Sequence, residues 1–191
     1  MKNNRQWTLL SQKREIFSLL SLILVVALGF LLVSCSTPKP PPLGVVSRVE
    51  RVVSGQTLEI IDPRSVVPAL KAVRLIGIAA PDLKQDPWGL LAQRYLEEIA
   101  LGKEVLLESD REQSDPYNRV LAYVWLDGVL LNEQLVKQGY VLADERIPNT
   151  KYSQRLLYAQ YEARILGQGI WNPEQPLRLT PTEFRRQNEQ Q

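Results

Sequence analysis

The order in which two periodicities follow each other constrains the fold of this chain more than any other feature. Alternation with period two indicates a half-buried strand, and apolar residues three and four apart indicate an amphipathic helix. Three extended segments come first, then one helix and then two more extended segments, over residues 45–53, 57–61, 72–78, 88–101, 104–108 and 120–126. This order is typical of an α+β fold built on a five-stranded OB barrel, in which a helix closes one end.

Two further helices are expected after the last strand. Asn132 can cap the first, over residues 132–138, and the second covers residues 152–166 with Leu157, Tyr161 and Ile165 on its apolar face. The barrel would therefore carry three helices in all. The aromatic side chains Tyr123, Trp125, Tyr158 and Tyr161 are expected to be core or semi-buried, and the acidic stretch 108–112 is expected to be solvated.

The first 34 residues are typical of a targeting segment, with basic residues before an apolar run over 16–33. Residues 32–35 (LVSC) resemble the bacterial lipobox, in which the cysteine becomes the lipidated first residue of the mature chain. We therefore expect a signal peptide over 1–34 and a lipid anchor on Cys35, the only cysteine. The alternative is an uncleaved membrane helix. Either reading predicts a protein held in the cell envelope and facing outside the inner membrane, on the outer-membrane or periplasmic side in a Gram-negative cell.

The other boundaries follow from composition. Residues 35–44 are rich in proline and predict an extended linker, and residues 45–173 predict the folded domain. Residues 174–191 are polar and predict a frayed C-terminal tail, with a basic contact patch at Arg185 and Arg186 as the alternative.

The absence of histidine excludes serine–histidine and cysteine–histidine catalysis. The net charge of +2 comes from 23 basic and 21 acidic side chains. Residues 1–34 hold four of the basic and one of the acidic ones, which leaves 19 and 20 for the remainder. A chain that is close to neutral is not expected to coat polyanions without selectivity, because such binding depends on excess positive charge.

Three segments resemble motifs of staphylococcal nuclease-like (thermonuclease) domains. Residues 74–82 (RLIGIAAPD) resemble the family's Arg-Leu-x-Gly-Ile-Asp-Ala-Pro-Glu, and residues 54–57 (SGQT) lie where the family has Asp-Gly-Asp-Thr. Residues 115–124 (DPYNRVLAYV) resemble Asp-x-Tyr-Gly-Arg-x-Leu-Ala-Tyr-Val. The resemblance continues in order to residue 171. It implies the OB-fold barrel and calcium-dependent hydrolysis of DNA and RNA phosphodiester bonds, with a glutamate as base and two arginines on the phosphate.

The resemblance places these roles on residues of this chain. Arg74 and Arg119 match the arginines, and Asp82 replaces the glutamate with a shorter carboxylate. The positions of the metal-binding aspartates hold Gln56 and Ala79, so the calcium site is expected to be degraded. Ala80 would still offer a backbone carbonyl, as the family's third ligand does.

Three functions remain open. The first is an active nuclease, either with a metal site rebuilt around Asp115 and Asp82, with Asp62 or Asp86 as other ligands, or with Asp82 and the arginines giving slow hydrolysis without a metal. Asp115 is the best substitute ligand, although it also suits a turn. The second, which we favour, is a degenerate nuclease whose arginines bind single-stranded nucleic acid or another phosphate-bearing ligand, unless Asp82 or Glu108 pairs with them. The third is a module that binds envelope proteins.

Overall fold

The computed structural model of the chain describes residues 42–62 and 69–188. The targeting segment, Cys35 and most of the proline-rich linker lie outside these residues, so the predictions made for them stay predictions. Within the described residues, no helix combines the length and the apolar character that crossing a membrane requires.

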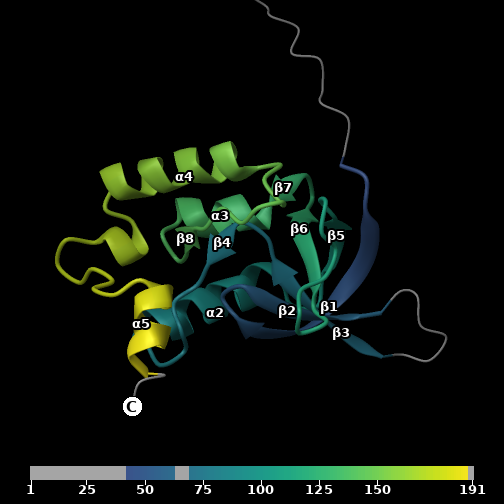
Figure 1. Ribbon diagram of the computed structural model, residues 1–191, viewed down its shortest axis with the longest axis horizontal. Helices are drawn as coiled ribbons and strands as arrows, with labels where there is room; N and C mark the ends of the chain where they lie inside the picture. The colour runs from purple at the N-terminus through teal and green to yellow at the C-terminus, as the bar shows by residue number, and fades with distance from the viewer. Residues whose placement is uncertain (1–41, 63–68, 189–191) are drawn as a thin grey trace, which may run out of the picture. The chain divides into compact units, whose positions relative to one another are not determined.

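Five strands close into a barrel (Figure 1). The sheet order is β3-β2-β1-β5-β6, and β3 also pairs in parallel with β6, which joins the two edges. The strands are β1 (Val45–Ser54), β2 (Thr57–Ile61), β3 (Leu70–Leu75), β5 (Glu104–Glu108) and β6 (Val120–Leu126). The predicted α+β architecture and the five-stranded barrel are therefore confirmed.

The short strands and the helices surround this barrel. Strand β7 (Val129–Leu130) extends the sheet beside β6, and β4 (Ile78–Ala79) pairs with β8 (Leu142–Ala143). The helices are α2 (Trp88–Ala100), α3 (Leu131–Lys137), α4 (Ser153–Ile165) and α5 (Pro181–Asn188), with a 3₁₀ turn η1 (Gly169–Trp171). Helix α4 lies over α3, and α2 packs against β1 (Figure 1).

One predicted strand is divided in two. Residues 72–78 were expected to form a single strand, but β3 ends at Leu75 and β4 begins at Ile78. Gly77 lies between them with φ of 75°, a conformation that side chains with a Cβ rarely adopt. This turn directs the chain away from the barrel and toward β8.

Asn132 does not cap a helix. Helix α3 begins at Leu131, and the Asn132 side chain is fully buried inside the fold. Its Oδ1 accepts a hydrogen bond from the Val124 N–H at 2.9 Å, and its Nδ2 donates one to the Ile76 carbonyl at 2.8 Å. The prediction was wrong because a polar residue at a helix start has the same local pattern whether it bonds its own helix or a distant strand.

The buried face of α4 also differs from the expected one. Leu156, Ala159 and Ala163 are buried, whereas Tyr161 and Ile165 are exposed. The small alanines allow α4 to approach α3 closely, so packing selects this stripe over the more hydrophobic one beside it. Tyr158 is exposed as well, while Tyr123 and Trp125 are buried as expected.

Glu108 is buried rather than solvated. Its carboxylate accepts hydrogen bonds from Trp125 Nε1 at 2.8 Å, Tyr152 Oη at 3.0 Å and Lys151 Nζ at 2.5 Å. These donors compensate for the loss of water around a buried charge. Glu108 is therefore a structural residue that joins β5 and β6 to the start of α4.

Candidate functional site

Arg74 lies at the centre of the candidate site. It is on β3 opposite Thr57 of β2, its side chain is 9% exposed, and it lines a cavity of about 330 Å³. Its guanidinium donates hydrogen bonds to the backbone carbonyls of Leu75 and Ile78, the second at 2.6 Å. These neutral acceptors fix the orientation of the cation without neutralising its charge.

No carboxylate of residues 42–62 or 69–188 lies within ion-pair distance of Arg74. The alternative that Asp82 or Glu108 pairs with this arginine is therefore wrong for the described part of the chain. Glu108 pairs with Lys151 instead. A buried cation without a counter-charge is costly, so an anion that enters the cavity would be stabilised there.

The electrostatic surroundings of Arg74 are cationic. Burial and, to a smaller extent, the positive charges of Arg146, Arg119 and Arg185 together lower its pKa to about 9, while Asp144 opposes this shift. Arg74 remains a cation at neutral pH because this pKa is above 7. The charges of Arg119, Arg146 and Arg185, which come from three different segments, therefore all act on the Arg74 guanidinium.

Arg119 lines the same cavity and is held by Asp115. Asp115 Oδ1 accepts the backbone N–H groups of Tyr117 and Arg119, each at 3.0 Å, and Oδ2 accepts Arg119 Nε and Nη2, each at 2.6 Å. Burial raises the pKa of Asp115, but the hydrogen bonds from Arg119 outweigh it and hold the pKa below its usual value. The carboxylate thus closes a turn and orients an arginine, which is the structural role considered for it above.

The positions that match metal ligands hold a different arrangement. Gln56 Oε1 accepts the Ala80 N–H at 2.7 Å, and the side chains of Ala79 and Ala80 are buried. Calcium requires several oxygen ligands, usually with carboxylates among them. Here one amide oxygen is already engaged and no carboxylate is present, so these residues do not fit a calcium ion of the family's kind. In the described part of the chain, no group of three or more acidic, histidine or cysteine side chains could hold a metal.

Asp82 belongs to the loop that follows β4. Its Oδ1 accepts the Lys84 N–H, and its own N–H donates to Gln85 Oε1, both at 2.9 Å. Asp82 is not among the residues that line the cavity around Arg74 and Arg119. The structure thus brings the two arginines together and places the matched carboxylate in the neighbouring loop.

The structure adds Arg146 to the site. This arginine lines the cavity and pairs with Asp144 at 2.8 Å. Beside it, the buried Asn149 joins two loops, because its Oδ1 accepts the Glu112 N–H and its Nδ2 donates to the Glu112 carbonyl. Arg146 lies in an irregular loop outside the quoted motifs, so nothing in the local sequence distinguished it from other surface arginines.

Comparisons with known proteins agree with this fold. The family model for staphylococcal nuclease homologues matches residues 72–173. The thermonuclease of Staphylococcus hyicus is 35% identical over 130 residues, which are 65% of this chain and 75% of that protein. The thermonuclease of Staphylococcus intermedius is 37% identical over 128 residues, which are 64% of this chain and 74% of that one. An uncharacterized endonuclease of Escherichia coli is 34% identical over 131 residues, which are 68% of this chain and 79% of that protein. Since the family model covers more than half of the chain, this protein belongs to the family of staphylococcal nuclease homologues.

Proposed function

We propose that this protein is a degenerate nuclease that binds single-stranded nucleic acid through its phosphate groups and has lost calcium-dependent cleavage. The observation that carries this proposal is the buried Arg74 guanidinium, which lines a cavity and has no carboxylate partner in the described residues. Arg119 and Arg146 line the same cavity. Charged hydrogen bonds from such arginines to phosphate oxygens are short and strong.

The ligand positions support the loss of the metal. Replacing two carboxylates by Gln56 and Ala79 removes the negative charge that holds a divalent cation. The Gln56 side chain instead joins the β1–β2 turn to the loop after β4, because its Oε1 accepts the Ala80 N–H. The matched ligand position thus takes part in a hydrogen bond within the fold, while both matched arginines are kept.

We also propose that a lipid on Cys35 tethers the domain to the cell envelope, outside the inner membrane. The support is the basic and apolar segment before a single cysteine in a lipobox-like context. A tethered domain with an anion-binding cavity would capture ligands at the envelope rather than in the cytoplasm.

The decisive experiment combines cleavage with binding. Digestion of single-stranded DNA and RNA is measured with calcium, with magnesium or manganese, and with chelator. The natural protein is compared with a Gln56→Asp/Ala79→Asp variant and with a charge-neutral Gln56→Asn/Ala79→Ser control. We expect cleavage, and calcium stabilisation of the fold, only in the variant with both aspartates. Metal-dependent cleavage by the natural protein would contradict the proposal and make Asp115 the next residue to change.

Binding is measured in chelator with a labelled single-stranded oligonucleotide. Arg119→Gln should weaken binding by about tenfold, because a charge-assisted hydrogen bond contributes on the order of 1.5–3 kcal/mol and this arginine is partly solvated. Unchanged affinity in this variant would refute the arginine cavity as the binding site. Absence of both binding and cleavage would favour a module that binds envelope proteins.

A further inference from the structure

Helix α4 is apolar on two opposite sides, and the domain covers only one of them. The inner side packs toward α3 through three buried residues, Leu156, Ala159 and Ala163. The outer side carries three large residues that remain exposed: Tyr158 at 63%, Tyr161 at 47% and Ile165 at 84%. Their spacing of three and four residues places them along one side of the helix. Clustered in this way, rather than scattered singly, exposed apolar residues indicate an interaction surface.

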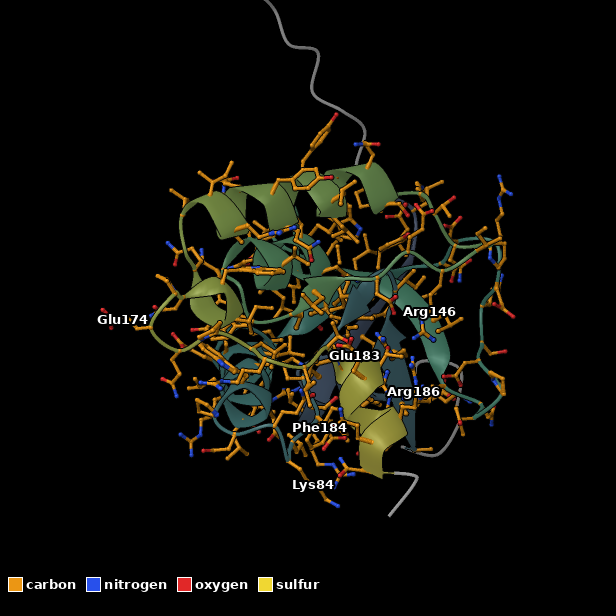
Figure 2. The ribbon with its side chains drawn as sticks, turned by 60° about the vertical axis from the view of Figure 1, so that its left-hand side comes forward. Lys84, Arg146, Glu174, Glu183, Phe184 and Arg186 are labelled. Atoms are coloured by element: carbon orange, nitrogen blue, oxygen red, sulfur yellow. The ribbon has the colours of Figure 1, made fainter. Side chains whose placement is uncertain are left out.

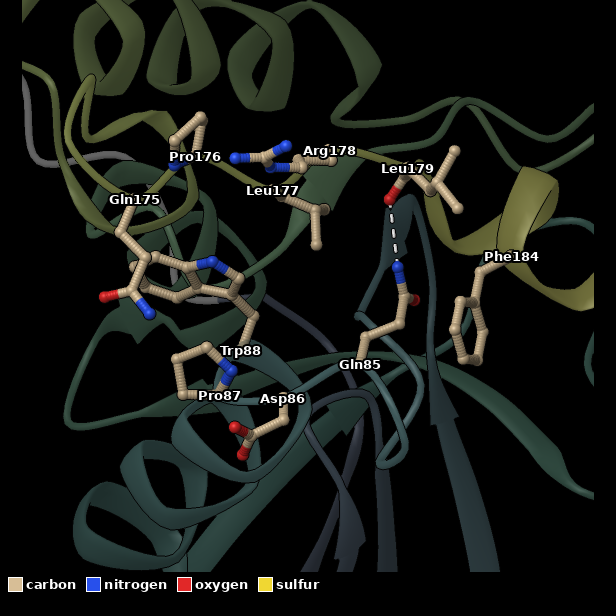
Figure 3. Close-up of a pocket in the computed structure, with 10 residues that line it drawn as sticks. All are labelled: Gln85, Asp86, Pro87, Trp88, Gln175, Pro176, Leu177, Arg178, Leu179 and Phe184. Carbon is tan, nitrogen blue, oxygen red and sulfur yellow. Dashed lines mark hydrogen bonds between the residues drawn. The ribbon is translucent and has the colours of Figure 1, made fainter.

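Helix α5 provides a contrast, because the domain covers its aromatic side chain. Figure 2 shows α4 and α5 at opposite ends of the domain. Phe184 of α5 is half-buried and lines a cavity of about 300 Å³ together with Trp88 (Figure 3). The Gln85 Nε2 donates to the Leu179 carbonyl at 2.9 Å, the dashed line in Figure 3, and so holds the segment before α5 on the domain. Within the described part of the chain, the outer side of α4 has no such cover.

The charges beside the outer side of α4 are engaged within the domain. Three contacts hold them: the ion pair of Arg155 with Glu133, the ion pair of Lys137 with Glu162, and the Arg164 guanidinium over the Trp171 ring. The surface that remains consists of two phenol rings and one aliphatic side chain. Tyrosine, with an apolar ring and a polar tip, is enriched where lipid headgroups meet acyl chains. The chemistry of this face therefore suits a membrane surface.

The chain enters the domain near the beginning of α4. Gly44 lies so close to the Leu107 carbonyl that a Cβ would not fit, and Val45 pairs with Leu107. The next residue, Glu108, accepts a hydrogen bond from Tyr152 Oη at 3.0 Å, and Tyr152 directly precedes α4. Figure 1 shows the start of β1 at the same end of the domain as α4.

The chain between the proposed anchor and the domain is short. Gly44 follows Cys35 by nine residues, which span at most about 30 Å even when fully extended. Helix α4 has 13 residues and is about 20 Å long. A domain held within this distance meets the membrane at a high effective concentration, so even a small apolar face is sufficient to hold it there.

We infer that the outer side of α4 lies in the surface of the membrane that anchors the protein, with Tyr158, Tyr161 and Ile165 between headgroups and acyl chains. This inference rests on the proposed anchor and adds an orientation to it. The arginine cavity stays open to ligands, since Figure 2 shows Arg146 displaced from α4 toward α5. Because the contact is apolar, it requires no particular headgroup.

The test places a fluorophore on α4 of the full chain, which is reconstituted in phosphatidylcholine vesicles. An environment-sensitive dye is attached to Ile165→Cys, and the natural chain, treated in the same way, reports any reaction at Cys35. The dye should emit at shorter wavelength in vesicles than in detergent-free buffer, and lipids with a nitroxide at the top of the acyl chain should quench it. Leu70→Cys is the matched control, since Leu70 is 59% exposed at the start of β3, which lies away from α4 in Figure 1.

A second variant tests the two tyrosines. Tyr158→Ser/Tyr161→Ser, with the dye again at position 165, should lose the shift and the quenching. Because both rings are exposed, the urea midpoint of this variant should match that of the natural chain, which separates loss of membrane contact from loss of the fold.

Each outcome also separates this inference from the proposed function. A dye at position 165 that stays in water would overturn the inference, while fractionation of Cys35→Ser and oligonucleotide binding still test the anchor and the cavity. Equal shifts at positions 165 and 70 would overturn it, because the domain would then have no preferred face. A shift that is lost at high salt would replace the apolar contact by charge. A shift without vesicles that grows with protein concentration would assign the face to a second copy of the chain. Release of the natural chain from membranes would overturn the anchor and this inference together.

Discussion

Replacement of Asn132 by alanine tests whether one buried amide holds the barrel to the loop at the site. The side chain bridges the Val124 N–H of β6 and the Ile76 carbonyl after β3, and Ile76 also lines the arginine cavity. Because Asn132 is fully buried, the alanine variant leaves one donor and one acceptor without a partner and without water.

The expected cost follows from these two groups. A buried polar group that loses its partner costs about 1–3 kcal/mol, so two such groups should lower the free energy of unfolding by about 2–6 kcal/mol. Domains of this kind are typically stable by about 5–15 kcal/mol, so the loss would be a large fraction of the total. Helix propensity acts in the opposite direction but contributes less than about 0.7 kcal/mol.

Urea unfolding followed by tryptophan fluorescence measures this loss. Gln134→Ala is the control on the same helix, since Gln134 makes one partly solvated hydrogen bond to Tyr95 Oη and should lose less than about 1 kcal/mol. Asn132→Asp keeps the acceptor for Val124 but points a carboxylate at the Ile76 carbonyl, so it should regain stability when acid protonates it. A loss below about 1 kcal/mol in Asn132→Ala would refute the reasoning.

Two further predictions concern alkaline pH and the membrane anchor. Burial raises the pKa of Tyr123 to about 12, and burial also raises the pKa of Tyr95 and Tyr152. Because the pKa of these hydroxyls is higher in the folded than in the unfolded chain, their protonated form stabilises the fold. This contribution is complete below about pH 10 and is lost as the pH rises from about 10 toward 12. For Tyr123 the loss lowers the free energy of unfolding by about 2–3 kcal/mol. Urea unfolding between pH 8 and pH 12 measures this loss, and a flat profile, or the same profile in Tyr123→Phe, would contradict it. For the anchor, Cys35→Ser should move the protein from the membrane to the soluble fraction after cell fractionation. Retention of this variant in the membrane would indicate an uncleaved helix instead of a lipid.

The sequence alone was sufficient to predict the barrel and to identify the two matched arginines. Strand and helix periods are local, and each follows from which side chains of a short segment face the core. The motifs at residues 74–82 and 115–124 lie on β3, β4, the loop before β6 and the start of β6, and the resemblance assigned Arg74 and Arg119 to one site. The structure pairs β3 with β6 and places both arginines on one cavity. The frayed tail expected over residues 174–191 is wrong for Pro181–Asn188, which form α5. Thr180 and Glu183 cap this helix by hydrogen bonds to each other, a pattern that the sequence contains but that we passed over because the segment is polar.

Only the tertiary structure decided which charges are paired. The sequence predicted a solvated Glu108 and left Asp115 open between a metal ligand and a turn residue, yet Glu108 is buried among three donors and Asp115 closes a turn around Arg119. Arg146 was indistinguishable from a surface arginine until long-range packing placed it on the cavity that Arg74 also lines. A pairwise charge interaction depends on distance and on access to water, and neither is a property of the local sequence. The sequence pattern therefore determined the fold and the candidate arginines, whereas the folded chain decided that Arg74 has no carboxylate partner among residues 42–62 and 69–188.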